Sequence, residues 1–165
     1  MPREISAGGV LVRAAGSGWE VAVIEPTREG GTSSSSARKT GKHGRVLALP
    51  KGIVDPGEKA AETAVREVFE ETGIRGAILA KLTDIKYVYV RSWGDKQRVF
   101  KIVSFYLLKY ESGEIDDVTP EMRIEVKQAL WIPLEGAETK LSYRGERDVI
   151  RLAQKHLQSH PEEKH

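Results

Sequence analysis

The chain has 165 residues, a length that suits one compact domain with a hydrophobic core and is short for two. Apolar residues make up 39% and charged residues 30%, a balance typical of a globular protein and not of a disordered or fibrous one. The formal charge of +2 lacks the large positive excess of proteins that bind nucleic-acid polymers, whereas a small anionic ligand needs only a local cluster of positive charge.

The absence of cysteine excludes disulfides, thiolate zinc sites and cysteine nucleophiles. No apolar run approaches the roughly 20 residues needed to cross a bilayer. The first five residues, Met1 to Ile5, do not form the apolar stretch of a secretory signal. We therefore expect a cytoplasmic protein that has no membrane partner.

Apolar periodicity and turn residues predict five strands and two helices. The predicted strands are 5–13, 19–25, 77–91, 98–110 and 129–132, and the predicted helices are 59–72 and 144–158. Residues 28–44, rich in Gly, Ser, Thr and basic side chains, predict a flexible insertion loop, and 159–165 are expected to fray. Because only one helix lies between successive strands, we expect a single α+β domain over 1–165, with a mixed sheet flanked by helices.

The first helix carries three glutamates on one face. Glu67, Glu70 and Glu71 have i, i+3 and i+4 spacing, which places them within an arc of about 100°. A separate arc, the predicted core-facing stripe, holds Ala61, Val65, Val68 and Thr72. Small residues border the acidic arc and leave room above the carboxylates; these are Ala60, Thr63 and Ala64. Gly73 follows the helix at the position where a left-handed cap is least costly.

Three carboxylates this close repel one another, and a divalent cation removes that repulsion. A set of oxygen ligands suits Mg²⁺, or Mn²⁺ as a substitute, better than zinc. The alternative is a solvated acidic helix face, which is what glutamates on helices usually form. The turn-rich segment that precedes the helix favours the metal site, because its glycines let backbone amides and carbonyls, including those around Gly52, approach a metal and a phosphate.

The segment from Gly52 to Ile74 resembles a known pattern. Gly52, then Glu58 after five residues, then Arg66-Glu67-Val68-Phe69-Glu70-Glu71-Thr72-Gly73-Ile74 after seven more, is similar to the complete Nudix box. The resemblance implies an α/β/α sandwich. It also implies a pyrophosphohydrolase that cleaves a nucleoside diphosphate linked to another moiety, with a small-molecule polyphosphate as its substrate.

The same resemblance implies the residues of the site. Glu67, Glu70 and Glu71 are expected to coordinate the metal, and one of them to deprotonate the attacking water; Arg66 and Glu58 complete the catalytic set. The backbone carbonyl of Lys51 is expected to join the metal ligands. A further acidic ligand is expected from the loop before the last strand, where Glu125 is the first candidate and Glu121 the second.

The resemblance specifies the substrate less closely than it specifies the fold and the site residues. Leu49-Pro50-Lys51-Gly52 and the tail from Trp131 to Val149 resemble a branch with diadenosine polyphosphate hydrolases, diphosphoinositol polyphosphate hydrolases and enzymes that clear oxidised nucleotides. A dinucleoside polyphosphate such as diadenosine tetraphosphate is our first expectation, followed by inositol pyrophosphates and oxidised nucleoside triphosphates. The alternative to a hydrolase is a regulatory module that binds a nucleotide without cleaving it. Such modules typically lack the glutamates present here.

Basic and aromatic residues on the two long strands suggest a polyphosphate site. Lys101 lies in an apolar row and needs an anionic partner if it is buried. A phosphate would serve, and two tyrosines on one strand face could stack on a base. The expected substrate-binding residues are Lys51, Gly52, Tyr87, Tyr89, Arg91, Arg98 and Lys101. The alternatives are that the tyrosines only pack and that Lys101 pairs with a structural carboxylate.

Overall fold

A computed structural model describes residues 1–27, 45–91 and 94–164. In chain order the elements are β1 (Arg3–Ala15), β2 (Gly18–Pro26), β3 (Lys51–Ile53), α1 (Ala60–Thr72), β4 (Ile74–Val90), β5 (Arg98–Gly113), η2 (Glu121–Ile124), β6 (Val126–Pro133), η3 (Ala137–Thr139), α2 (Arg144–Ser159) and η4 (Pro161–Lys164), where η denotes a 3-10 helix. The five predicted strands and both predicted helices are confirmed. The short strand β3 was not predicted, because three residues between turns carry no periodic signal.

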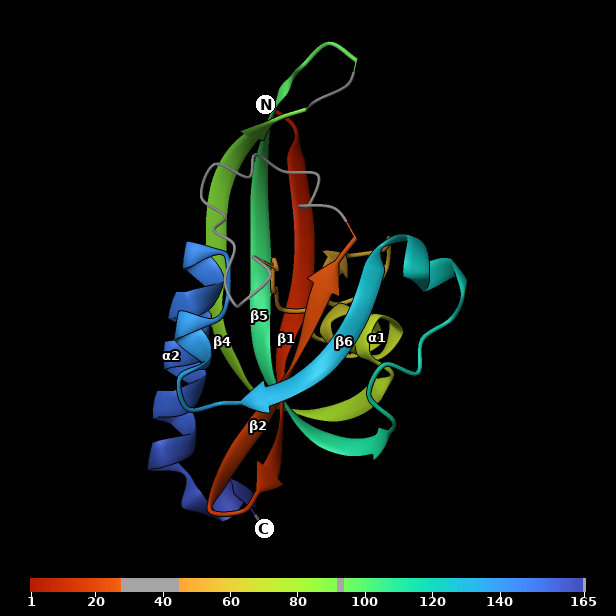
Figure 1. The fold of residues 1–165 in the computed structure, drawn as a ribbon. Coiled ribbons are helices and arrows are strands. Elements are labelled where there is room, and N and C mark those ends of the chain that lie inside the picture. The colour runs from red at the N-terminus through yellow and green to blue at the C-terminus, as the bar shows by residue number, and fades with distance from the viewer. Residues whose placement is uncertain (28–44, 92–93, 165) are drawn as a thin grey trace.

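The strands form one mixed sheet in the order β4-β5-β1-β2-β6 (Figure 1). β1 runs parallel to β5, and the other pairs are antiparallel. β3 pairs with β1 outside this path, with Gly8 opposite Lys51. The expected mixed sheet flanked by helices is therefore confirmed.

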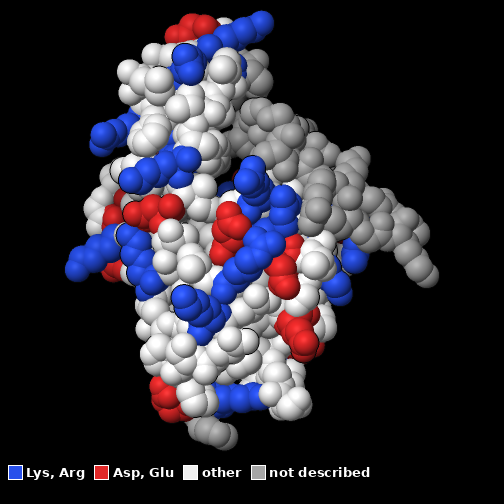
Figure 2. Space-filling view, turned by 90° about the vertical axis from the view of Figure 1, so that its left-hand side faces the viewer, with Lys and Arg blue, Asp and Glu red and all other residues white. Residues whose placement is uncertain are grey.

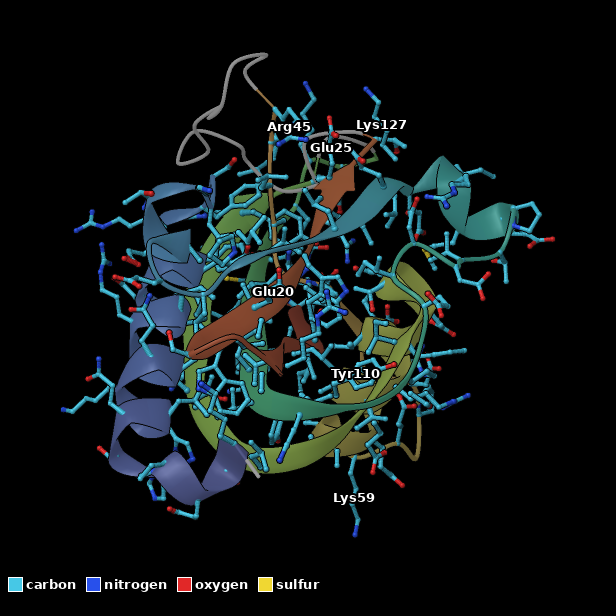
Figure 3. All side chains as sticks on the ribbon, turned by 60° about the horizontal axis from the view of Figure 1, so that its bottom comes forward. Glu20, Glu25, Arg45, Lys59, Tyr110 and Lys127 are labelled. Atoms are coloured by element: carbon cyan, nitrogen blue, oxygen red, sulfur yellow. The ribbon has the colours of Figure 1, made fainter. Side chains whose placement is uncertain are left out.

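The two helices cover opposite faces of the sheet, as Figures 1 and 3 show. Alternate residues of β1 face the two layers. Val10 and Val12 join a large buried cluster that includes the apolar stripe of α2, whereas Leu11 packs in a second cluster with Val68 of α1 and Leu108 of β5. This three-layer arrangement places β3 and the segment before it close to both helices.

Local interactions explain where α1 begins and ends. The Glu62 carboxylate accepts a hydrogen bond from the Lys59 amide at 2.8 Å, which satisfies one of the free donors of the first turn. Gly73 ends the helix with φ +86°, a conformation that a side chain disfavours, and its amide donates to the Phe69 carbonyl at 2.8 Å.

The predicted core-facing stripe of α1 was wrong in part. Val68 and Thr72 are buried as expected, but Ala61 and Val65 are only partly buried. Three residues outside the predicted stripe are buried instead: Thr63, Ala64 and Glu71. The reason is that α1 contacts both β1 and β3, so two sides of the helix are covered, including the side that carries Glu71.

The remaining sequence predictions concern the chain's exterior. The predicted insertion loop 28–44 lies outside the described residues, and the expected frayed tail contains the 3-10 helix η4 in its described part. No helix in the described ranges is long and apolar enough to cross a membrane. Figure 2 shows basic and acidic side chains intermingled on the side that carries α2 and β4, as the small net charge suggests.

Candidate active site

A cavity of about 1040 Å³ opens beside β3. Its walls come from β1, the segment 48–53, the middle of β4 and β5, the loop before β6 and the first turn of α2. Two of the predicted metal ligands on α1, Glu67 and Glu71, line it, together with Lys51, Gly52 and Glu125. Predicted site residues from β3, from α1 and from the loop before β6 therefore line the same cavity.

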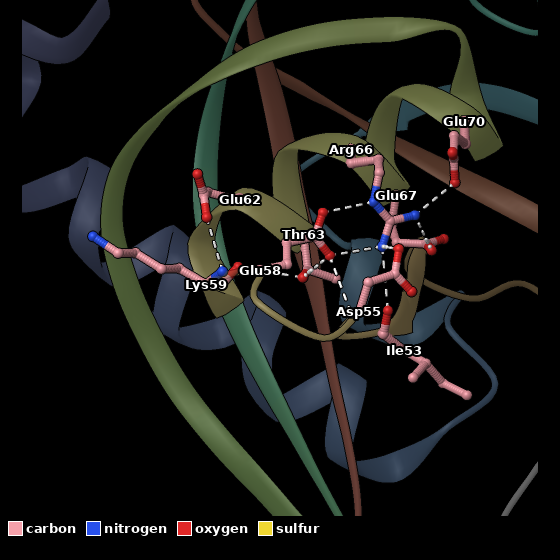
Figure 4. Close-up of polar contacts among 9 residues, drawn as sticks. All are labelled: Ile53, Asp55, Glu58, Lys59, Glu62, Thr63, Arg66, Glu67 and Glu70. Atoms are coloured by element: carbon pink, nitrogen blue, oxygen red, sulfur yellow. Dashed lines mark hydrogen bonds and ion pairs between the residues drawn. The ribbon is translucent and has the colours of Figure 1, made fainter.

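Arg66 contacts acidic side chains that lie just before α1 and in its second half (Figure 4). Its guanidinium contacts Glu58 twice, at 2.8 and 2.9 Å, and its Nη1 contacts Glu67 at 2.8 Å and Glu70 at 3.0 Å. Nη2 also donates to the Ile53 carbonyl at 3.2 Å. Hydrogen bonds from Arg66 and Thr63 lower the pKa of Glu58 to about 2. Arg66 and Glu58 thus act on the orientation of other side chains, and neither lines the cavity.

Glu71 is the most enclosed carboxylate of the set, with 6% of its surface exposed. Its Oε1 accepts a hydrogen bond from the Lys51 amide at 3.2 Å. Burial raises the pKa of Glu71 well above its ordinary value, and the neighbouring Glu67 carboxylate raises it further. Burial also raises the pKa of Glu67, although Arg66 opposes this shift. Two carboxylates in partly desolvated contact are a place where added positive charge is strongly favoured.

Gly52 allows the Glu67 carboxylate to approach the backbone of β3. A Cβ atom at this position would lie 2.1 Å from Cδ of Glu67 and 2.3 Å from its Oε1. A side chain at position 52 fits only if the Glu67 carboxylate moves away. The first glycine of the predicted motif is therefore required by the position of a carboxylate that lines the cavity.

The donors fit a hard divalent cation. Glu67 and Glu71, with Glu125 and the backbone around Lys51 nearby, offer only oxygen ligands, which is the chemistry that Mg²⁺ and Mn²⁺ prefer. Among residues 1–27, 45–91 and 94–164, no group of three or more acidic or histidine side chains is arranged to hold a metal ion. The role of Glu67, Glu70 and Glu71 as one ligand set therefore stays a prediction. Glu70 does not line the cavity, and its side chain is 42% exposed beside Arg66.

The sequence analysis missed Glu146, a buried carboxylate on α2 that also lines the cavity. Its Oε2 lies 3.2 Å from Nζ of Lys51, and its Oε1 accepts a hydrogen bond from the Leu49 amide at 2.8 Å. A buried glutamate needs such partners. Because Glu146 lies 95 residues after Lys51, only the folded chain reveals the pair.

Lys101 has a structural partner, as the alternative interpretation had it. Its Nζ lies 2.8 Å from Oε1 of Glu4, and Oε2 of the same carboxylate accepts a hydrogen bond from the Tyr89 hydroxyl at 2.9 Å. Lys101 lines the cavity but its charge is matched there. Tyr89 is 4% exposed and is a packing residue, so its expected role in stacking on a base was wrong.

The other expected ligand residues divide between the cavity and its surroundings. Tyr87 lines the cavity, whereas Arg91, Arg98 and Glu121 do not. Arg144, at the start of α2, is an exposed cation on the cavity wall that forms no ion pair with the described residues. Like Glu146, it was not singled out from the sequence, because neither residue belongs to a local motif.

Several known proteins share sequence with this chain. A putative mutator protein MutT4 of Mycobacterium tuberculosis is 36% identical over 151 residues, which cover 91% of this chain and 54% of that protein. An 8-oxo-(d)GTP phosphatase of Mycolicibacterium smegmatis is 32% identical over 63% of this chain and 29% of its own length. A mouse bis(5'-nucleosyl)-tetraphosphatase (asymmetrical) is 35% identical over 53% of this chain and 56% of its own. The chain spans about half the length of MutT4 and less of some other relatives.

The fold is also found in solved structures. A C. elegans Ap4A hydrolase, in a binary complex, matches with a TM-score of 0.65 and 20% identity over 94% of this chain and 98% of that one. The family model described as the NUDIX domain matches residues 17–153, which contain β2 to β6, α1 and the cavity carboxylates. The chain therefore belongs to the Nudix family.

Proposed function

We propose that this protein hydrolyses a pyrophosphate linkage in a nucleoside polyphosphate and uses a divalent cation, Mg²⁺ or Mn²⁺, to do so. One observation carries the proposal: Glu67 and Glu71 lie together, largely desolvated, on the wall of a cavity of about 1040 Å³. Ligand sites usually occupy roughly 300–1000 Å³, so this space suits a nucleotide with several phosphates.

Each residue of the site has a separate task in this proposal. Glu67 and Glu71 hold the cation, with Glu125 and the Lys51 carbonyl as further ligands. A bound Mg²⁺ supplies charge neutralisation at the phosphoryl oxygens and lowers the pKa of a bound water. Arg66 keeps Glu67 oriented, and Glu70, within reach of the same guanidinium, is available as a base or a further ligand.

A dinucleoside polyphosphate such as diadenosine tetraphosphate is the first candidate substrate. The mouse relative is named a bis(5'-nucleosyl)-tetraphosphatase. Leu49-Pro50-Lys51-Gly52, with Pro56-Gly57-Glu58, resembles the branch that contains diadenosine polyphosphate hydrolases. The cavity has an acidic side at Glu67 and Glu71 and an apolar side with Ile85, Val103 and Phe105, which suits a phosphate chain attached to a base. Arg144 at the wall is then available for a distal phosphate.

An oxidised nucleoside triphosphate is the second candidate. The mycobacterial relative that is named an 8-oxo-(d)GTP phosphatase favours it. The third candidate, a diphosphoinositol polyphosphate, would draw on basic residues of the loop 28–44, which lie outside the described residues.

The test is a substrate panel with and without EDTA. Purified protein is incubated with diadenosine tetraphosphate, 8-oxo-dGTP and a diphosphoinositol polyphosphate in Mg²⁺, and the products are separated. We expect ATP and AMP from the first substrate and no product in EDTA. Glu71→Gln should lower turnover by two or more orders of magnitude. Losing a ligand of the metal should raise the barrier by about 3 kcal/mol or more, and each 1.36 kcal/mol is about tenfold in rate. Product formed in EDTA would contradict the metal-dependent reaction, and no product from any substrate would favour a nucleotide-binding module.

A further inference from the structure

We propose that Glu146 is a positioning residue for the reaction: through the ion pair with Lys51 and the hydrogen bond to the Leu49 amide, the C-terminal helix holds the backbone segment that fixes Glu71. This inference rests on the proposed function for its catalytic consequence, but not for its structural part. It concerns a residue that lies outside the Nudix box.

The segment 47–51 is tied to the start of α2 by several hydrogen bonds. The Leu47 amide donates to Oγ of Ser142 at 3.0 Å, and the Ser142 amide donates to the Leu47 carbonyl at 3.0 Å. Two residues further along, the Leu49 amide donates to Oε1 of Glu146 at 2.8 Å. Glu146 thus provides the last contact of this series before the cavity carboxylates.

On its other side the same segment is attached to β1. The Gly9 amide donates to the Pro50 carbonyl at 3.1 Å, and Lys51 pairs with Gly8. The Lys51 amide then donates to Glu71, and Gly52 accommodates Glu67. A shift of residues 49–51 would therefore displace the amide that donates to Glu71 and disturb the neighbouring backbone of Gly52, against which the Glu67 carboxylate lies.

The second oxygen of Glu146 directs the Lys51 side chain. Oε2 lies 3.2 Å from Nζ, and the Tyr143 ring centroid lies 5.8 Å from the same nitrogen. Glu146 is 4% exposed, and this ammonium group and the Leu49 amide are the polar partners that a buried carboxylate needs. The Lys51 ammonium group is therefore held between Glu146 and the Tyr143 ring, and the Glu146 and Glu71 carboxylates raise its pKa in spite of burial.

The kinetic test is a double-mutant cycle, measured with diadenosine tetraphosphate and Mg²⁺ in wild type, Glu146→Gln, Lys51→Met and the double variant. We expect Glu146→Gln to lower kcat/KM by about tenfold to a hundredfold, as a displacement of about 1 Å near the chemistry does. Gln keeps an oxygen that can accept from the Leu49 amide, so this substitution removes the ion pair with Lys51. In the Lys51→Met background that pair is already absent, and the same change should lower kcat/KM by less than threefold. Glu135→Gln, an exposed acid outside the cavity, is the matched control.

An equal loss of kcat/KM in both backgrounds, or wild-type kcat/KM in Glu146→Gln, would overturn the inference. A second readout does not need turnover: amide hydrogen exchange at Leu49 and Lys51 should accelerate at least tenfold in Glu146→Ala, while amides in the β4–β5 ladder keep their wild-type rates. Unchanged exchange at both amides would also overturn it. A wild-type protein without turnover would refute the proposed function alone, and exchange would then decide the positioning role.

Discussion

Single residues at the cavity are constrained by how closely their neighbours approach. Gly52 has no room for a Cβ because the Glu67 carboxylate occupies that space, and the buried Glu71 carboxylate accepts a hydrogen bond from the Lys51 amide. The chemistry of these carboxylates therefore depends on backbone atoms of β3 as much as on the helix that carries them.

Gly52→Ala is expected to lower kcat strongly while the protein remains folded. The added methyl group must displace the Glu67 carboxylate, and misplacing a catalytic group by about 1 Å can cost about a hundredfold in rate. Gly18→Ala is the matched control, because a Cβ there meets nothing within 4 Å. Comparable kcat values in both variants, measured with saturating Mg²⁺, would contradict the role of Gly52.

Local patterns revealed some of these residues and not others. The spacing of Glu67, Glu70 and Glu71 was sufficient to predict a shared helix face, because helix geometry relates neighbours three and four residues apart. It could not show that Glu70 turns toward Arg66 and away from the cavity. Glu146 and Arg144 were missed because the fold, not the local sequence, brings them to the site.

At the scale of elements, one carboxylate ties three strands together. Glu4 of β1 contacts Lys101 of β5 and Tyr89 of β4, and these strands are adjacent in the sheet. The ammonium and the hydroxyl satisfy both oxygens of Glu4, and hydrogen bonds from Lys101 and Tyr89 lower its pKa in spite of burial. The arrangement is a structural connection between strands at the cavity wall.

Lys101→Met is accordingly expected to reduce stability more than substrate affinity. Removing the ammonium leaves a partly buried carboxylate with one partner, which costs about 1–3 kcal/mol in the free energy of unfolding. Urea denaturation measures this cost, and Lys81→Met, which breaks an exposed pair with Asp84, should cost less than about 1 kcal/mol. If Lys101→Met instead raised KM tenfold or more and left the free energy of unfolding unchanged, the result would indicate that Lys101 binds a phosphate of the substrate.

At the scale of the whole molecule, the site carboxylates lower the stability of the metal-free protein as the pH rises. The pKa of Glu71 is raised in the folded state above its ordinary value of 4.5, mainly by burial, and that of Glu67 is raised as well. Their contribution to stability is therefore fully present below about pH 4.5 and is lost as the pH rises through the folded pKa. Glu58, with a folded pKa of about 2, has the opposite dependence and loses its contribution as the pH falls.

In EDTA, Glu71→Gln is thus expected to gain stability over wild type as the pH rises from 5 to 8. The neutral amide has no proton to lose, whereas each proton released by the wild type changes the free energy of unfolding by at most about 1.4 kcal/mol per pH unit. Urea denaturation at several pH values gives the difference between the two proteins. A difference that stays constant with pH would contradict the raised pKa of Glu71.

Much of the fold followed from periodicity, since long alternating strands and an Ala- and Glu-rich helix carry strong local signals. Periodicity did not predict the full core-facing stripe of α1. The helix contacts β3 as well as β1, and it therefore also buries Thr63, Ala64 and Glu71. β3 itself depends on pairing with β1, a partner distant in sequence. The buried face of α1 and the strand β3 could not be predicted, because both depend on contacts between segments that are distant in sequence.

The most direct measurement is a calorimetric titration of the metal-free protein with Mn²⁺. We expect saturable uptake by the wild type and by the control Glu135→Gln. In Glu67→Gln and Glu71→Gln we expect an affinity at least tenfold lower, which corresponds to about 1.4 kcal/mol. Wild-type protein that takes up no metal, or variants that bind it as tightly as the wild type, would contradict the claim that these two glutamates hold the cation.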